Sequence, residues 1–501
     1  MKKRNVIALA GVALLSSGIL AACSGGSKSS SSNSSESGQK FSYVYETEPE
    51  NLNYITSGKA ATHEITGNLI DGLFENDKYG NLIPSLAKDW TVSEDGLTYT
   101  YKLRKGVKWY TSDGEEYAEV TAKDFVTGLK HAADKKTESI YLAKDSVVGL
   151  ADYFNGTDKD FSKVGVKALD DYTLQYTLKQ PEPYWNSKMT YSLFWPVNEE
   201  FLKSKGDSFG KSTDPSSILY NGPYILKSLT AKSSIELAKN ENYWDKKNVH
   251  FDGIKLSFYD ASDQESLVRN FTDGAYSQAR LYPTSSNFNS VEKQYKDNIF
   301  YTQPSADIGG VGVNIDRQSY NHTSKKTDAE KDSTKKALLN KDFRQSVNFA
   351  IDRTAYSAQL NGEKGAALAV RNLLVKPDFV YAGDKSFGDL VTEKMPSYGD
   401  EWSGVNLKDS QDGLFNADKA KTEFNKAKEA LQAQGVQFPI HLDLPVDQAA
   451  KPTVARAQSL KQSVEKTLGK ENVVVDVHQM SQDDLLNSTL YAANAAAEDW
   501  D

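Results

Sequence analysis

The position of the one cysteine is the feature that most constrains this chain. Cys23 follows a basic start, Met1 to Arg4, and an apolar run that ends in Leu20-Ala21-Ala22. A charged start, an apolar stretch and small residues before a cleavage point are typical of a secretory signal peptide. A cysteine at that point predicts attachment of a lipid, and the alternative is an ordinary signal peptide with a chance cysteine. Since there is no second thiol, the exported body must be stabilised by packed cores rather than by disulfides.

The composition fits a large exported body. The 501 residues are 39% hydrophobic and 11% aromatic, which is enough for two to four domain-sized units with their own cores. The net charge of −9 is a poor match for nucleic acid, which requires clustered Lys and Arg. After the leader, no apolar run approaches the roughly 18 residues that a membrane span needs. We therefore expect the body to lie outside the membrane and to be held there by its N-terminus.

A linker follows the cysteine. Residues 24–40 read SGGSKSSSSNSSESGQK, a composition too poor in apolar residues to form a core. Such a Ser- and Gly-rich segment has a root-mean-square span of roughly 20–25 Å. This length would lift a folded body clear of the lipid headgroups and keep it near membrane partners.

The first half of the chain predicts mostly strands. Alternating apolar residues indicate strands at 41–45, around Val92, at 98–103 and at 172–178, and Ser93-Glu94-Asp95-Gly96 predicts a turn. Helical spacing of apolar residues predicts helices over 65–74 and from Thr121, as the N-cap, to about Ala133.

The second half predicts alternating helices and strands. Helices are expected over 335–353, 417–434 and 452–468, and the last two end at Gly435 and Gly469. Strands are expected at 440–444 and 473–477, so the final part reads as a βαβ unit with a parallel pair. The polar segment 319–336 predicts an exposed loop, with a functional charged loop as the alternative. Two such different halves indicate more than one lobe.

Motifs for catalysis are incomplete. His63-Glu64 begins like a zinc-protease HExxH motif but lacks the second histidine, and the other histidines are scattered. We find no GxSxG nucleophile motif and no phosphate-binding loop, and Ser-x-x-Lys recurs at chance level without its companion motifs. We therefore expect no enzyme activity, no metal and no cofactor.

An ordered set of motifs resembles a known family. It includes Glu48-Pro49, NLIDGLF at 68–74, PSLAKDWTVSEDGLTYTYKLRKGVKW at 84–109, TAKDFV at 121–126, NGPY at 221–224, NYWD at 242–245, and Phe343-Arg344 with Ile351-Asp352-Arg353. In this order they resemble the oligopeptide-binding lipoproteins of ABC importers, solute-binding protein family 5. The segments YNGPY, DQESLVRNF and FPIHLD are most similar to those of the streptococcal AmiA/AliA/AliB group.

This resemblance implies an α/β, two-lobed periplasmic-binding-protein-like fold with an extra subdomain on the first lobe. The expected division is a signal peptide at 1–22, a lipidated linker at 23–40, lobe I at 41–70 and 190–285, the subdomain at 71–189, and lobe II at 286–501. An extended peptide would be held between the lobes as an added strand, and lobe closure would signal to the permease. The protein would be a monomer on the outer face of the cell membrane, bound through lipid alone. The alternatives are a peptide-sensing or adhesion lipoprotein, or a receptor for another solute such as nickel.

Placement against the family pattern also implies binding residues. The candidates are Gly58, Lys59, Ala60, Tyr141, Asn221, Tyr276, Arg280, Asn314 and Asp443. Arg280 is expected to meet a peptide carboxylate and Asp443 a peptide amine. For each residue the alternative is a surface charge or a structural hydrogen bond.

Two departures from the family pattern matter. The loop Gly58-Lys59-Ala60 lacks the acidic residue that the family usually has nearby. The sequence also stops at Trp500-Asp501, before the family's Gly-Trp-x-x-Asp-Tyr motif, whose aspartate holds the peptide amine. We therefore expect lobe II to be incomplete.

Overall fold

The computed structural model describes residues 39–300 and 308–501. The predicted signal peptide, the lipidation site Cys23 and nearly all of the linker lie outside the described residues. The chain divides into two compact units at Phe258 and Tyr259. The border predicted at 285/286 falls inside the second unit. None of the helices in the described part of the chain combines the length and apolar composition needed to cross a bilayer.

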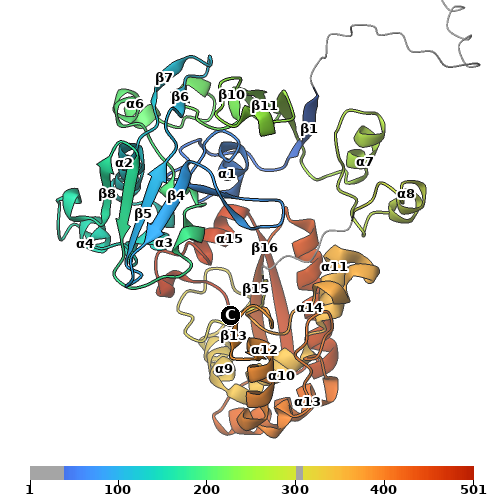
Figure 1. The fold of residues 1–501 in the computed structure, drawn as a ribbon. Coiled ribbons are helices and arrows are strands. Elements are labelled where there is room, and N and C mark those ends of the chain that lie inside the picture. The colour runs from blue at the N-terminus through green and yellow to red at the C-terminus, as the bar shows by residue number, and fades with distance from the viewer. Residues whose placement is uncertain (1–38, 301–307) are drawn as a thin grey trace, which may run out of the picture. The chain divides into compact units, whose positions relative to one another are not determined.

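The first unit is rich in strands (Figure 1). Its strands are β1 (Lys40–Tyr45), β2 (Phe74–Asn76), β3 (Leu82–Pro84), β4 (Ala87–Val92), β5 (Thr98–Leu103), β6 (Lys108–Tyr110), β7 (Glu116–Glu119), β8 (Val166–Asp170), β9 (Thr173–Thr177), β10 (Tyr224–Thr230), β11 (Ser234–Lys239) and β12 (Gly253–Phe258). Its helices are α1 (Ala60–Thr66), α2 (Ala122–Asp134), α3 (Tyr141–Lys144), α4 (Leu150–Asn155), α5 (Trp185–Lys188) and α6 (Glu199–Lys205). The predicted strands and the helix after Thr121 are confirmed.

Two four-stranded sheets organise this unit. One has the order β1-β12-β11-β10, with β1 parallel to β12 and the other pairs antiparallel. The other, β4-β5-β9-β8, is antiparallel throughout. Alternation along β5 and β9 places Tyr99, Tyr101 and Tyr176 in the core, where they are at most 4% exposed.

The helix predicted over 65–74 is wrong. Helix α1 ends at Thr66, and the following backbone bonds to the NGPY segment instead of continuing the helix. Leu69 O accepts from the N–H groups of Asn221 and Gly222, and Asp71 N–H donates to Asn221 Oδ1. A Cβ on Gly222 would lie 2.6 Å from the carbonyl carbon of Leu69, so this close approach requires glycine.

The second unit is mainly helical. Its helices are α7 (Glu265–Thr272), α8 (Phe288–Gln294), α9 (Asp328–Leu339), α10 (Lys341–Ala350), α11 (Arg353–Gly365), α12 (Phe387–Lys394), α13 (Ala417–Ala433), α14 (Lys451–Leu468) and α15 (Gln482–Ser488). Its strands are β13 (Tyr381–Ala382), β14 (Lys385–Ser386), β15 (Ile440–Asp447) and β16 (Val473–Met480). A separate apolar core lies between α9, α10, α13, α14 and the pair β15–β16 (Figure 1).

The predicted βαβ unit is confirmed. Strands β15 and β16 are parallel, with Ile440 opposite Val473, and α14 connects them. Gly435 and Gly469 follow α13 and α14 with φ of +75° and +88°, a region where glycine has no steric penalty. The outer edge of β16 is capped by α14, because Val475 N–H donates to Glu465 Oε1 and Lys461 Nζ donates to Val475 O.

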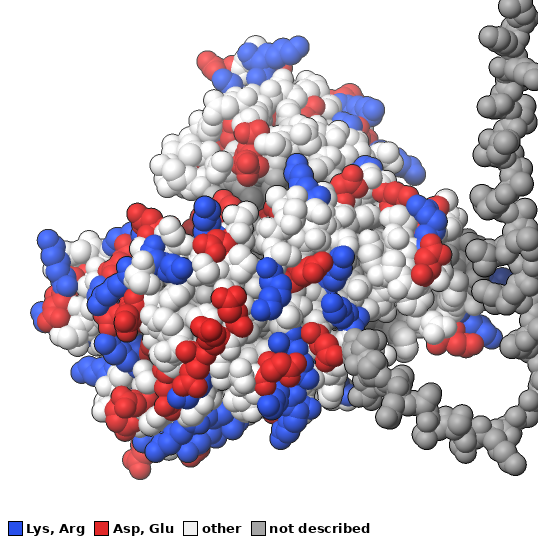
Figure 2. All heavy atoms as spheres, turned by 90° about the horizontal axis from the view of Figure 1, so that it is seen from above, with Lys and Arg blue, Asp and Glu red and all other residues white. Residues whose placement is uncertain are grey.

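Two predictions for this unit are wrong in part. The helix expected over 335–353 is two helices, because the extended backbone of Asn340 ends α9 and its Oδ1 accepts from Phe343 N–H to cap α10. The segment 319–336, predicted as an exposed loop, contains the start of α9 and the buried Lys325. On the molecular surface drawn in Figure 2, acidic and basic side chains are interspersed.

Candidate functional site

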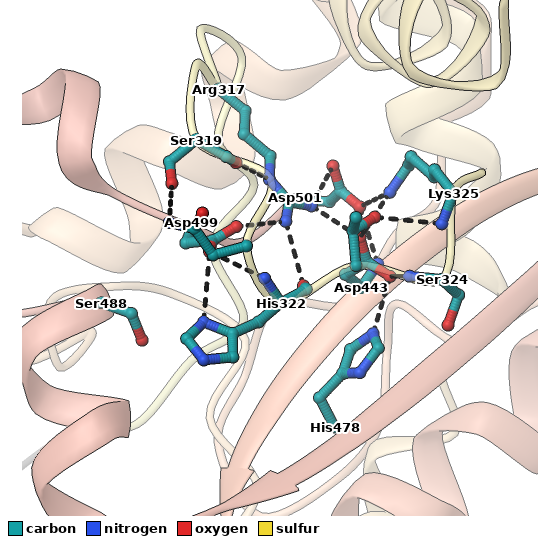
Figure 3. A network of polar contacts seen from close by, with 12 residues as sticks. Arg317, Ser319, His322, Ser324, Lys325, Asp443, His478, Ser488, Asp499 and Asp501 are labelled. Carbon is teal, nitrogen blue, oxygen red and sulfur yellow. Dashed lines mark hydrogen bonds and ion pairs between the residues drawn. The ribbon is translucent and has the colours of Figure 1, made fainter. Parts of the chain in front are cut away.

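Five charged side chains meet in a buried cluster in the second unit, which we call the ion cluster (Figure 3). It consists of Arg317, Lys325, Asp443, Asp499 and Asp501, whose side chains are at most 3% exposed. The Nη1 of Arg317 lies 2.7 Å from Asp443 Oδ2 and 3.1 Å from Asp501 Oδ1. The Nη2 of Arg317 lies 2.6 Å from Asp499 Oδ1. Lys325 Nζ lies 2.7 Å from Asp443 Oδ2 and also pairs with Asp501.

Three segments far apart in sequence supply these residues. Asp443 lies on β15, Arg317 and Lys325 bracket the loop before α9, and Asp499 and Asp501 follow α15. Arg317 folds its own loop by donating to Ser319 O and His322 O. Asp501 N–H donates to Asp443 O at 3.3 Å, and Asp443 N–H donates to Asp501 Oδ2 at 2.7 Å. The ion cluster therefore fixes residues 499–501 beside β15.

Electrostatics favour the ionised form of Asp443 and Asp499. Burial raises the pKa of Asp443, but its hydrogen bond with His478 and the charge of Lys325 outweigh burial and lower the pKa well below its usual range. Burial also raises the pKa of Asp499, but the hydrogen bond with Arg317 outweighs burial, so the pKa of Asp499 is lowered. Two imidazoles border the cluster: His478 Nε2 lies 2.8 Å from Asp443 Oδ1, and His322 Nδ1 lies 3.1 Å from Asp499 Oδ2.

Asp443, predicted to meet a peptide amine, is therefore already engaged inside the second unit. Its carboxylate accepts hydrogen bonds from Arg317, Lys325, Thr323 Oγ1 and the backbone N–H of Ser324. These contacts give Asp443 a structural role, and its contact with a ligand amine stays a prediction.

The first unit brings two of the predicted segments together. Gly58 and Ala60 are exposed at the start of α1, and Lys59 is half-buried at its N-cap position. Tyr141 begins α3 and is 69% exposed. The two segments adjoin because Thr137 Oγ1 donates to Thr56 O at 2.8 Å and a Cβ on Gly58 would lie 3.1 Å from Glu138 Oε2.

Asn221, another predicted binding residue, is 1% exposed and bonds to the backbone of Asp71. Asp71 is itself buried, and its Oδ2 accepts from Tyr243 Oη at 2.9 Å and Trp244 Nε1 at 2.8 Å. Burial raises the pKa of Asp71 to about 7, although these two hydrogen bonds oppose the rise. Asn221 thus belongs to a buried polar group that ties the NLIDGLF, NGPY and NYWD motifs together.

The remaining candidates lie in the second unit. Tyr276 and Arg280 lie between α7 and α8, and the Arg280 guanidinium stacks 4.6 Å from the ring centre of Tyr282. Asn314 is half-buried three residues before Arg317. Because the predicted residues divide between two separately described units, their convergence on one ligand stays a prediction.

Sequence reasoning missed most of the ion cluster. Arg317 and Lys325 contact Asp443 across 126 and 118 residues, and no local pattern marks such pairs. Surface hollows of about 220 Å³ beside Asp134 and about 390 Å³ beside Glu199 contain none of the predicted binding residues. Among residues 39–300 and 308–501, no group of histidine, cysteine, aspartate or glutamate side chains is arranged to hold a metal ion.

Comparison with known proteins identifies the family. Residues 81–501 match the model of the bacterial extracellular solute-binding proteins, family 5. The chain is 69% identical over 501 residues to the oligopeptide-binding protein AmiA of Streptococcus pneumoniae, covering all of this chain and 75% of that protein.

Solved structures share the fold. One is the substrate-binding domain of an oligopeptide ABC transporter from Bacillus anthracis, with a TM-score of 0.66, 24% identity, and coverage of 93% of this chain and 78% of that one. Another is Listeria monocytogenes OppA bound to peptide, with a TM-score of 0.64, 22% identity, and coverage of 90% and 79%. The predicted two-lobed, periplasmic-binding-protein-like fold is confirmed. By sequence and by fold, the chain belongs to the bacterial extracellular solute-binding proteins of family 5, as its ordered motifs indicate.

Proposed function

We propose that this protein captures oligopeptides outside the cell and delivers them to the permease of an ABC importer. The observation that carries this proposal is the 69% identity, over the whole chain, to a protein named for oligopeptide binding. The same comparison favours a binding protein without enzyme activity, since capture requires no chemical step.

The first unit offers one part of a ligand surface. The loop Gly58-Lys59-Ala60 and the exposed Tyr141 adjoin through Thr56 and Thr137. A tyrosine ring supplies a large contact area at low entropic cost, and the exposed Gly58, which has no side chain, lets a peptide backbone approach. This supports a site that recognises the peptide main chain and tolerates varied side chains.

The leader supports the cellular location. Cys23 after Ala21-Ala22 favours a lipid anchor on the outer face of the membrane, with the Ser-rich linker as a tether. Replacing Cys23 with serine should release the protein from the membrane fraction into the medium. Retention of Cys23→Ser in the membrane fraction at the wild-type level would contradict the anchor.

Binding is tested with a pool of synthetic hexapeptides. The protein is incubated with an equimolar pool, retained peptides are identified by mass spectrometry, and the most strongly retained peptide is titrated by calorimetry. The control is the same pool hydrolysed to amino acids. We expect retention of peptides only, with Tyr141→Ala weakening affinity about tenfold through lost contact area. Tyr79→Ala, which removes a tyrosine 77% exposed in the turn between β2 and β3, should leave affinity unchanged. No retention of any peptide would refute the proposal.

Transport is tested in the source cell. Deletion of the gene should reduce uptake of the retained peptide, and expression of the wild-type gene should restore it. Normal uptake in a deletion strain that lacks the other binding proteins would favour sensing or adhesion over import.

A further inference from the structure

An exposed carboxylate lies beside the loop Gly58-Lys59-Ala60 in the first unit. It belongs to Glu138, whose Oε2 lies 3.1 Å from the position that a Cβ on Gly58 would occupy. This carboxylate forms no hydrogen bond or ion pair with any residue that the structure describes. Because Gly58 has no side chain to cover it, a ligand can approach the carboxylate from solvent.

The lysines nearest to this carboxylate in sequence are engaged elsewhere. Lys135 Nζ lies 3.3 Å from Asp207 Oδ1, and Lys136 Nζ lies 4.2 Å from the ring centre of Phe154. Lys59, which follows Gly58 in the loop, is half-buried and has an interaction of its own. The negative charge of Glu138 is therefore left without a cation from its own segment.

Local helix geometry places an aromatic ring on the same side as this charge. Glu138 begins a 3₁₀ helix, Glu138–Ile140, that leads directly into α3 at Tyr141. In a 3₁₀ helix, side chains three residues apart lie on the same side, so Glu138 and the 69% exposed Tyr141 share one face. A cation is attracted to a carboxylate and to the face of a tyrosine ring. Both groups on this face therefore favour a positive charge.

Hydrogen bonds hold this segment at both ends. Before the 3₁₀ helix, Thr137 Oγ1 donates to Thr56 O at 2.8 Å. At α3, Lys188 Nζ donates to Leu142 O at 3.1 Å and lies 2.7 Å from Glu182 Oε2, in a pair whose side chains are only 17% and 5% exposed. A binding face that is ordered before the ligand arrives loses little entropy on binding.

We propose that Glu138 and Tyr141 form a subsite for a lysine or arginine side chain of the bound peptide. This rests on the proposed function and adds to it a preference for basic peptides. The stem of such a side chain packs on the Tyr141 ring, and its charged head reaches the carboxylate and stays hydrated. Because Glu138 is exposed, the preference is modest and weakens as salt is added.

The test compares peptides that differ only in one charge. The retained hexapeptide is synthesised with lysine at each position in turn, and again with norleucine, which keeps the lysine stem without its ammonium group. An exposed ion pair corresponds to about a 1.4- to fivefold change in affinity. At one position or more, we expect the lysine peptide to bind wild type about two- to fivefold more tightly than the norleucine peptide. In Glu138→Gln, this ratio should fall to about one.

The control is Glu115→Gln, at an exposed glutamate in the turn between β6 and β7, away from α3 (Figure 1). Both changes are nearly isosteric and lie on the surface, so neither disturbs a core. Glu115→Gln should keep the wild-type ratio.

The outcomes separate this subsite from the proposed function. Equal affinities of wild type for the lysine and norleucine peptides, or an unchanged ratio in Glu138→Gln, would overturn the subsite alone. So would a loss of affinity in Glu138→Gln that disappears when the peptide amine is acetylated, because Glu138 would then meet the amine. Failure of the wild-type protein to bind any hexapeptide would overturn the proposed function and the subsite together.

Discussion

Replacing Lys325 with methionine should strongly destabilise the second unit. Methionine is apolar and has nearly the length of the lysine stem, so the change removes the charge and keeps most of the packing. Asp443 and Asp501, whose side chains are 0% and 3% exposed, then share Arg317 as their remaining cation. Removing one partner of a buried ion pair costs about 3–5 kcal/mol, because the charge left behind is uncompensated. At this burial, solvent does not screen the loss, so we expect that full range.

The assay must report on the second unit separately, since two units need not unfold together. Hydrogen exchange of peptides from β15 and β16, followed against urea concentration, gives their free energy of unfolding. The control is Lys335→Met, which breaks a 2.9 Å pair with Asp316 whose side chains are 41% and 71% exposed. That change should cost less than about 1 kcal/mol. The double variant Lys325→Met/Asp501→Asn should recover at least about 1 kcal/mol, because it also removes an unpaired charge. Equal losses for Lys325→Met and Lys335→Met would refute the reasoning.

Three further predictions follow from buried polar groups. The pKa values of Asp443 and Asp499 lie below 3.8 in the folded protein. The stability that these carboxylates contribute is therefore present above about pH 4 and is lost as pH falls through the folded pKa values. An unfolding midpoint of the second unit that stays constant from about pH 5 to about pH 2 would contradict this. The pKa of Asp71 is raised from 3.8 to about 7, so its ionisation opposes folding and stability falls as pH rises between those values. We expect Asp71→Asn to unfold at a higher temperature than wild type at pH 8, and an unchanged pH slope in this variant would argue against the assignment. Glu465→Ala leaves the N–H of Val475 without its acceptor, which should cost about 1–3 kcal/mol and accelerate exchange of that amide; wild-type protection there would show that the cap is dispensable.

Local physics made the βαβ unit predictable. Residues 440–444 alternate apolar and polar side chains, residues 473–477 are mostly β-branched, the segment between them has helical periodicity, and Gly469 ends the helix. Each of these signals acts within a few residues of chain, and all point to the same structure. The helix after Thr121 was predictable for the same reason.

The incorrect predictions arose where tertiary contacts override local pattern. Apolar spacing favours a helix through Leu69 and Ile70, but hydrogen bonds from Asn221 and Gly222 hold that backbone in a different form. The periodicity over 335–353 is genuine, yet Asn340 caps a second helix instead of continuing the first. A capping side chain competes with helix continuation, and apolar periodicity does not show which one prevails.

The candidate site was the least predictable part, because its electrostatics are long-range. Family placement drew attention to Asp443, but not to Arg317 and Lys325, which lie more than a hundred residues away in sequence. In a polar stretch such as 319–336, a buried lysine has the same local pattern as an exposed one. Only the fold places these cations against β15 and shows that Asp443 is neutralised within its own unit.

The ion cluster should affect peptide binding as well as stability. Arg317 and Lys325 hold residues 499–501 against β15, beside the predicted binding residue Asp443. Lys325→Met should therefore lower both the stability of the second unit and the affinity of the protein for peptide, because it loosens this segment. Lys335→Met, which leaves the ion cluster unchanged, should alter neither by more than a small amount. Wild-type affinity in a folded but destabilised Lys325→Met variant would show that the ion cluster serves stability alone.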